Sequence, residues 1–171
     1  MLASAGFSQD SSLISRIIRK LTGAPCSHAF LIVAVAEFGR EMVLEASAFG
    51  IRMISLERFL SRNTLVARFD FGAKLEPGLR EAATWLGETY DFGGLLGMAL
   101  VLVGRWLRKK WINPLHRAHS LFCSELVTQV LQTSSAGGVA VAALVPEDTS
   151  PGDLLAALKS TARRLEHQKP L

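Results

Sequence analysis

A cysteine lies at the point where a polar stretch of the sequence turns into a helix with an apolar face. Cys123 falls within the run S-L-F-C-S-E-L at 120–126, and apolar side chains recur at helical spacing through residue 132. The first turn of a helix offers unpaired N–H groups and the positive end of the helix dipole, and both lower the pKa of a thiol. The position therefore suits a nucleophilic thiolate, although a buried core cysteine explains the same run.

A histidine stands at the start of the first aliphatic run. His28 directly follows Ser27 and opens the β-branched stretch 28–36, which predicts a strand. An imidazole at a sheet edge can take the proton of a thiol and later give it to a leaving group. His116 and His119 are nearer to the cysteine in sequence, but residues so close in one loop rarely reach the geometry of a thiolate–imidazole pair. His28 is thus the predicted base, and a structural strand histidine is the alternative.

A carboxylate is available to orient that imidazole. Glu45 interrupts an otherwise apolar strand at 41–47, which is the natural hairpin partner of the strand that begins at His28. A buried carboxylate costs free energy unless it is paired or solvated, so its place in this strand favours a functional role. Accepting the second ring proton of His28 would complete a Cys-His-Glu triad. The alternative is an edge strand on which Glu45 faces solvent.

Four further residues have chemistry that a site could use. Glu125, two positions after the cysteine, is predicted to face away from it and to stabilise the helix dipole or form an ion pair. Cys26 has no second pair at metal-ligand spacing, so we interpret it as a small buried residue and expect no metal site and no cofactor. Tyr90 could donate a hydrogen bond to a developing oxyanion, whereas Tyr90 and Asp91 are equally typical of an ordinary helix start.

The elements that must position these side chains form a small antiparallel sheet followed by helices, which indicates an α+β fold. The first helix has apolar residues at 13, 14, 17, 18 and 21 and ends near Gly23. We predict strands at 28–36, 41–47, 51–55 and 64–71, and a short helix at 56–60. Helices then follow from Pro77, at 91–110 and at 120–132, and residues 139–145 suit a last strand.

Length and composition fit one domain. The 171 residues are 49% hydrophobic and 20% charged, so a sizeable core can form, which we place at about 10–157 with a solvated tail at 162–171. Two cysteines cannot form a disulfide framework. The net charge of +4 comes without the interleaved aromatic and basic side chains of a nucleic-acid surface, so no nucleic-acid partner is expected. The N-terminus lacks the pattern of a signal peptide, so any export would use another route.

The longest apolar run, 92–103, is shorter than the roughly 20 residues that a membrane span needs. We therefore expect a buried helix there. The basic residues that follow, Arg105, Arg108, Lys109 and Lys110, keep contact with a lipid or membrane surface open as the alternative.

Five short motifs together resemble the circularly permuted NlpC/P60 superfamily. They are S-H-A at 27–29, V-L-E-A at 43–46, Y-D-F at 90–92, F-C-S-E-L at 122–126 and S-P-G-D-L at 150–154. The order of histidine, polar residue and cysteine is similar to that of the YaeF and YiiX-type branch, which is related to the lecithin retinol acyltransferase group. The resemblance covers roughly residues 10 to 157.

The resemblance implies a papain-like fold in which Cys123 is the nucleophile, His28 the base and Glu45 the third member. The leading hypothesis is a cysteine peptidase or amidase that forms a thioester intermediate on a peptide or peptidoglycan-like substrate. An acyltransferase or thioesterase that acts on lipid is the first alternative. A binding module that keeps the fold with an idle site is the second.

Overall fold

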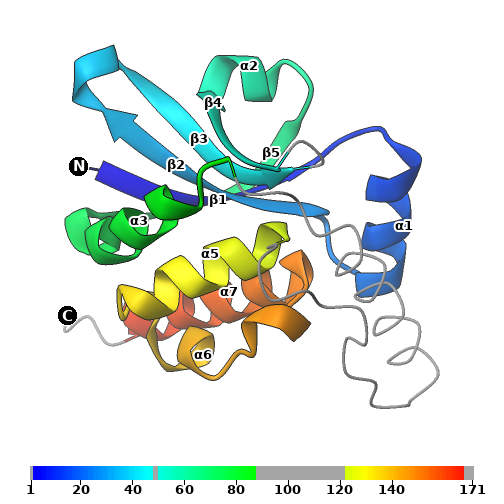
Figure 1. Ribbon diagram of the computed structural model, residues 1–171. Helices are drawn as coiled ribbons and strands as arrows, with labels where there is room; N and C mark the ends of the chain where they lie inside the picture. The colour runs from blue at the N-terminus through cyan, green and yellow to red at the C-terminus, as the bar shows by residue number, and fades with distance from the viewer. Residues whose placement is uncertain (1, 48–49, 88–121, 168–171) are drawn as a thin grey trace.

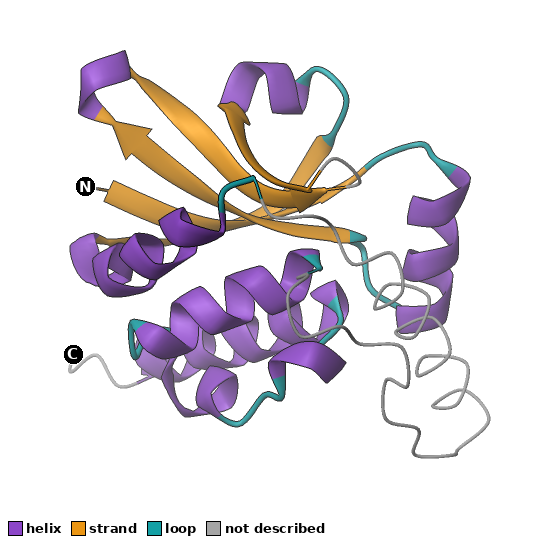
Figure 2. Cartoon of the chain, in the orientation of Figure 1, coloured by secondary structure: helices purple, strands orange, loops and turns teal. Residues whose placement is uncertain are grey.

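The computed structural model describes residues 2–47, 50–87 and 122–167, and it has an α+β architecture (Figure 1). A five-stranded antiparallel sheet carries most of its helices on one face, as Figure 2 shows by element type. The α+β class predicted from the sequence is confirmed at this level.

The sheet has the strand order β4-β3-β2-β1-β5, and all its neighbours pair antiparallel. Its strands are β1 (Leu2–Gln9), β2 (His28–Val35), β3 (Arg40–Ser47), β4 (Gly50–Ser55) and β5 (Thr64–Gly72). The last four confirm the predicted strands within one or two residues at each end.

Strand β1 was not predicted, although it lies inside the sheet between β2 and β5. Its residues 3–6 are small and lack the β-branched or aromatic signal of a strand. At Gly6 the packing explains why the residue is small, because a Cβ atom there would lie 2.5 Å from the ring of Phe30 on β2. A small residue is therefore needed where the aromatic ring covers the neighbouring strand.

The helices gather around the two faces of the sheet. Helices α3 (Glu76–Ala82), α5 (Cys123–Thr133), α6 (Gly138–Ala142) and α7 (Pro151–His167) lie on one side in Figure 1. The short helix α2 (Leu56–Leu60) lies on the other side, and α1 (Leu13–Thr22) flanks the end of the sheet at which β2 begins. The predicted helices at 13–21, at 56–60, from Pro77 and at 120–132 are confirmed.

The strand predicted at 139–145 is wrong, because Gly138–Ala142 forms helix α6. Alternating Val and Ala suggested a strand, but the buried side chain of Val141 packs in the helical layer. The side-chain amide of Gln132 on α5 donates to the carbonyls of Val141 and Leu144, at 3.0 and 2.9 Å, and so satisfies acceptors that end this helix. Helix α7 also continues to His167, past the predicted start of the tail at residue 162.

Two apolar clusters hold the layers together. The larger lies between the sheet and α3, α5 and α7, and it includes Leu31 of β2 and Leu126 of α5. The smaller is formed on the opposite face by Phe30, Ile32, Val43 and Phe59. Strand β2 is thus buried on both faces, which fixes the place of its first residue, His28.

Several sequence predictions lie outside the described residues. These are the helix at 91–110, the roles of Tyr90, His116 and His119, and the basic group of Arg105, Arg108, Lys109 and Lys110. Within the described ranges, no helix is both long enough and apolar enough to cross a membrane.

Candidate active site

Helix α5 begins at Cys123, so the cysteine lies in the first turn of the helix predicted at 120–132. The residue before it, Phe122, has extended backbone angles, and its N–H donates to the carboxylate of Glu125 at 3.4 Å. This contact caps the first turn of the helix. Glu125 is only 2% exposed, so the residue predicted to stabilise the helix dipole is a buried capping residue.

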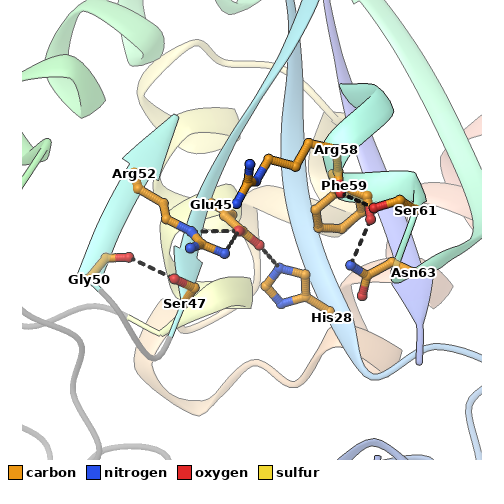
Figure 3. Close-up of polar contacts among 9 residues, drawn as sticks. All are labelled: His28, Glu45, Ser47, Gly50, Arg52, Arg58, Phe59, Ser61 and Asn63. Carbon is orange, nitrogen blue, oxygen red and sulfur yellow. Dashed lines mark hydrogen bonds and ion pairs between the residues drawn. The ribbon is translucent and has the colours of Figure 1, made fainter. Parts of the chain in front are cut away.

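His28, Glu45 and Arg52 form a linked trio on three neighbouring strands (Figure 3). Nε2 of His28 lies 2.8 Å from Oε2 of Glu45. The other carboxylate oxygen, Oε1, accepts from Nε and Nη2 of Arg52 at 2.9 and 2.7 Å. Both oxygens of a carboxylate that is only 5% exposed are therefore engaged, which removes the main cost of burying it.

The strand registers bring these three side chains together. Glu45 is directly opposite Arg52 in the β3–β4 pair. Side chains alternate across a strand, so His28 shares a face with Phe30 two positions later. The imidazole ring lies between two aromatic neighbours, with ring centroids 5.9 Å from Phe30 and 6.0 Å from Phe59. These rings restrict the orientation of the imidazole beside Glu45.

Cys123 and His28 interact electrostatically, and their pKa values move in opposite directions. Burial disfavours the imidazolium, but the charge and hydrogen bond of Cys123, with Glu45, outweigh it and raise the pKa of His28 to about 10. Burial likewise disfavours the thiolate, but His28 and the backbone N–H groups of Ala29 and Ser124 lower the pKa of Cys123. Burial also opposes the charge of Glu45, whose pKa is nevertheless lowered, chiefly by its bond to His28. Both shifts favour a thiolate–imidazolium pair over a neutral thiol and imidazole.

A second set of hydrogen bonds fixes the start of strand β2. The N–H of Ser27 donates to the carbonyl of Ser8 at 2.9 Å. The hydroxyls of Ser15 and Ser27 lie 2.6 Å apart and join helix α1 to the residue before His28. Ser27, which the sequence analysis named only as part of the S-H-A motif, therefore tethers the start of β2 to β1 and α1.

The other cysteine is buried and contacts the start of α7. Cys26 is fully buried, and its thiol donates to the carbonyl of Pro151 at 3.6 Å. Burial, with the negative charge of Cys123, raises the pKa of Cys26 to about 11. The interpretation of Cys26 as a small buried residue is confirmed.

The S-P-G-D-L motif caps helix α7 beside that contact. The N–H and hydroxyl of Ser150 donate to the Asp153 carboxylate at 3.1 and 2.6 Å, and the N–H of Asp153 donates back to the Ser150 hydroxyl at 3.2 Å. The motif therefore fixes the start of helix α7.

A pocket of about 380 Å³ gives access to these groups. Its lining includes Cys123, His28, Glu45 and Arg52, together with side chains from α1 and α2. Among the described residues, no group of three or more His, Cys, Asp or Glu side chains could hold a metal ion.

Sequence reasoning missed Arg52. Oppositely charged residues that face each other across a hairpin stabilise it, so pairing the strands about the turn at Gly50 would have placed Arg52 against Glu45. Tyr90, for which the sequence left open an oxyanion donor or an ordinary helix start, lies outside the described residues.

Comparison with protein-family models found no match for this chain, and a search among curated proteins found none.

Proposed function

We propose that the protein is a cysteine hydrolase of the peptidase or amidase type, with Cys123 as nucleophile, His28 as acid and base, and Glu45 as the group that orients the imidazole. The proposal is supported above all by the hydrogen-bonded line from Arg52 through Glu45 to His28, which ends in electrostatic contact with a thiol at a helix start. Structural ion pairs also shift pKa values, but here the shifted groups line one pocket.

The first half-reaction forms a thioester. With Nε2 of His28 engaged by Glu45, Nδ1 is the ring nitrogen left for Cys123. The Cys123 thiolate attacks the amide carbon, so that a C–S bond forms and the carbonyl oxygen takes negative charge. The N–H of Cys123, in the first turn of α5, has no partner within its helix and is the proposed oxyanion donor. The C–N bond then breaks as His28 gives its proton to the leaving amine.

The second half-reaction returns the free enzyme. Neutral His28 takes a proton from water as the water oxygen attacks the thioester carbon. The C–S bond breaks, the acid product leaves, and Cys123 is again a thiolate beside the imidazolium. In both halves Glu45 holds the ring and stabilises its positive charge, and Arg52 holds Glu45.

The substrate class rests on the resemblance, which implies cell-wall peptides. A panel of such peptides should give turnover with the wild-type protein and a Cys123 thioester in intact-protein mass spectra after rapid acid quenching. Cys123→Ser and Cys123→Ala should abolish turnover while circular dichroism and melting temperature stay close to wild type. Full turnover by Cys123→Ser would remove Cys123 as the nucleophile. A wild-type protein in which Cys123 reacts no faster than Cys26 with iodoacetamide would favour the binding module with an idle site.

A specific observation favours a second candidate, an acyltransferase or thioesterase that acts on lipid. Helix α1 exposes Leu13, Ile14 and Ile17, which are 65%, 61% and 47% exposed, next to the pocket. Exposed apolar side chains on one helix face suit the interface of a membrane. Flotation with anionic vesicles tests this reading. Binding that is lost in the Leu13→Ser/Ile14→Ser variant supports it, and no binding by the wild-type protein sets it aside.

A further inference from the structure

Within the part of the chain that the structure describes, the candidate active site opens into a groove lined by arginines whose side chains have no partner. The pocket around Cys123 and a neighbouring hollow of about 530 Å³ share Asp10, Arg62 and Asn63 in their linings. The two hollows therefore adjoin at Arg62. The groove runs from the thiol between helix α1 and the end of α2.

Three arginines along this groove have side chains without a partner among the described residues. Arg58 is on α2 (Figure 3), Arg62 is four residues later, and Arg19 is on the facing helix α1. Nε of Arg19 is buried, and no residue of the described ranges accepts a hydrogen bond from it. A buried donor without an acceptor costs free energy that a bound anion would recover.

The charges in the groove do not cancel. Arg52 is neutralised by Glu45, and the His28 imidazolium by the Cys123 thiolate. Among the described residues that line the two hollows, Asp10 is the one other carboxylate. It has to balance the charges of three arginines, Arg19, Arg58 and Arg62. The Asp10 carboxylate accepts a hydrogen bond from the N–H of Ser12 at 2.6 Å, so part of its hydrogen-bonding capacity is used within its own loop.

We propose that this groove binds a substrate that carries an anionic group, a carboxylate or a phosphate, on the side of the scissile bond that extends toward Arg62. Guanidinium groups bind both anions through paired N–H donors. The inference rests on the proposed function, since it assumes that the substrate reacts at Cys123. It adds that the substrate must carry a negative charge, which the contacts among His28, Glu45 and Arg52 do not require.

The test compares two thiol reagents that differ only in charge. 3-Maleimidopropionate and its neutral amide alkylate the same sulfur, and peptide mapping reads the rate at Cys123. We expect the ratio of anionic to neutral rate to fall about tenfold in Arg58→Gln/Arg62→Gln relative to wild type, because a field of fixed charges concentrates oppositely charged reagents. Arg40→Gln is the control for a positive charge lost outside the groove, since Arg40 is exposed at the far end of β3, and Arg62→Gln alone is the single-charge variant to compare with it. The ratio in Arg40→Gln should stay within about twofold of wild type, because salt screens distant surface charges.

The two sources of negative charge are separated by competition at equal ionic strength. Inorganic phosphate that slows alkylation by the neutral amide more than acetate does indicates a phosphate group, and the reverse indicates a carboxylate. Either protection should be lost in Arg58→Gln/Arg62→Gln and in Arg19→Gln. An unchanged rate ratio in the double variant overturns the anion groove and leaves the nucleophile assignment intact. Failure of the neutral amide to alkylate Cys123 overturns the nucleophile, and the groove proposal with it.

Discussion

Both cysteines lie near the start of strand β2, but their surroundings differ. Cys26 is fully buried, and its thiol meets a backbone carbonyl, which is an acceptor and favours the protonated form. Cys123 is 6% exposed, lines a pocket, and meets N–H donors and an imidazole. Both lie in low-dielectric surroundings, yet one pKa rises to about 11 and the other is lowered. Burial opposes the thiolate at both sites, and only at Cys123 do the charge of His28 and the N–H donors outweigh it.

The largest effect should come from removing the reactive thiol. We expect Cys123→Ala to lower kcat by about 10⁴-fold or more, because loss of a nucleophile removes the covalent route altogether. A steady-state assay on the best peptide substrate measures this. A loss of less than tenfold would show that the reaction does not pass through Cys123.

The base should come next. His28→Gln keeps a polar side chain of similar reach but cannot carry a proton, so kcat should fall by about 10²- to 10⁴-fold. The pKa of Cys123 should also rise toward its ordinary value, because its positive neighbour is gone. Thiol titration by absorbance at 240 nm reads that shift independently of turnover. An unchanged Cys123 pKa in this variant would break the proposed pair.

The groups that hold the imidazole should have smaller effects. Arg52→Gln should reduce kcat/KM by about tenfold and raise the pKa of Glu45, since the carboxylate loses two donated hydrogen bonds. Because Arg52 is more than a third exposed, the loss in free energy of unfolding should be only about 1 kcal/mol. The acid limb of the pH profile should move to higher pH, which a purely structural role would not cause. Arg52→Lys should restore part of the activity through its remaining charge.

The buried cysteine should matter least for activity. Cys26→Ala removes a packed sulfur and should cost about 1 to 2 kcal/mol in the free energy of unfolding. Because this residue takes no part in the proton transfers, kcat per folded molecule should stay within about twofold. Denaturant unfolding and active-site titration provide the two numbers. A large loss of kcat in a variant that is fully folded would mean that Cys26 contributes to the site.

The sequence predicted those elements whose own residues form a recognisable local pattern. The aliphatic run after His28, the interruption of a strand by Glu45 and the apolar period after Cys123 predicted the elements that hold the candidate site. Strand β1 was missed because its residues 3–6 are small, and the reason for Gly6, the ring of Phe30 on the neighbouring strand, is a contact that adjacent residues do not reveal. Arg52 was missed because its role depends on strand register. The strand predicted at 139–145 failed because alternating Val and Ala suits a short packed helix as well.

The pH dependence of thiol alkylation tests the central claim most directly. A lowered pKa keeps Cys123 as thiolate when the pH falls below the ordinary value of about 8.5, and the raised pKa of His28 keeps the imidazolium until about pH 10. With iodoacetamide and peptide mapping from pH 4 to 10, the rate at Cys123 should level off at a lower pH than the rate of an ordinary thiol. The rate at Cys26 should still be rising above pH 9. A Cys123 rate that climbs through pH 8.5 like that of an ordinary thiol would contradict the thiolate–imidazolium pair.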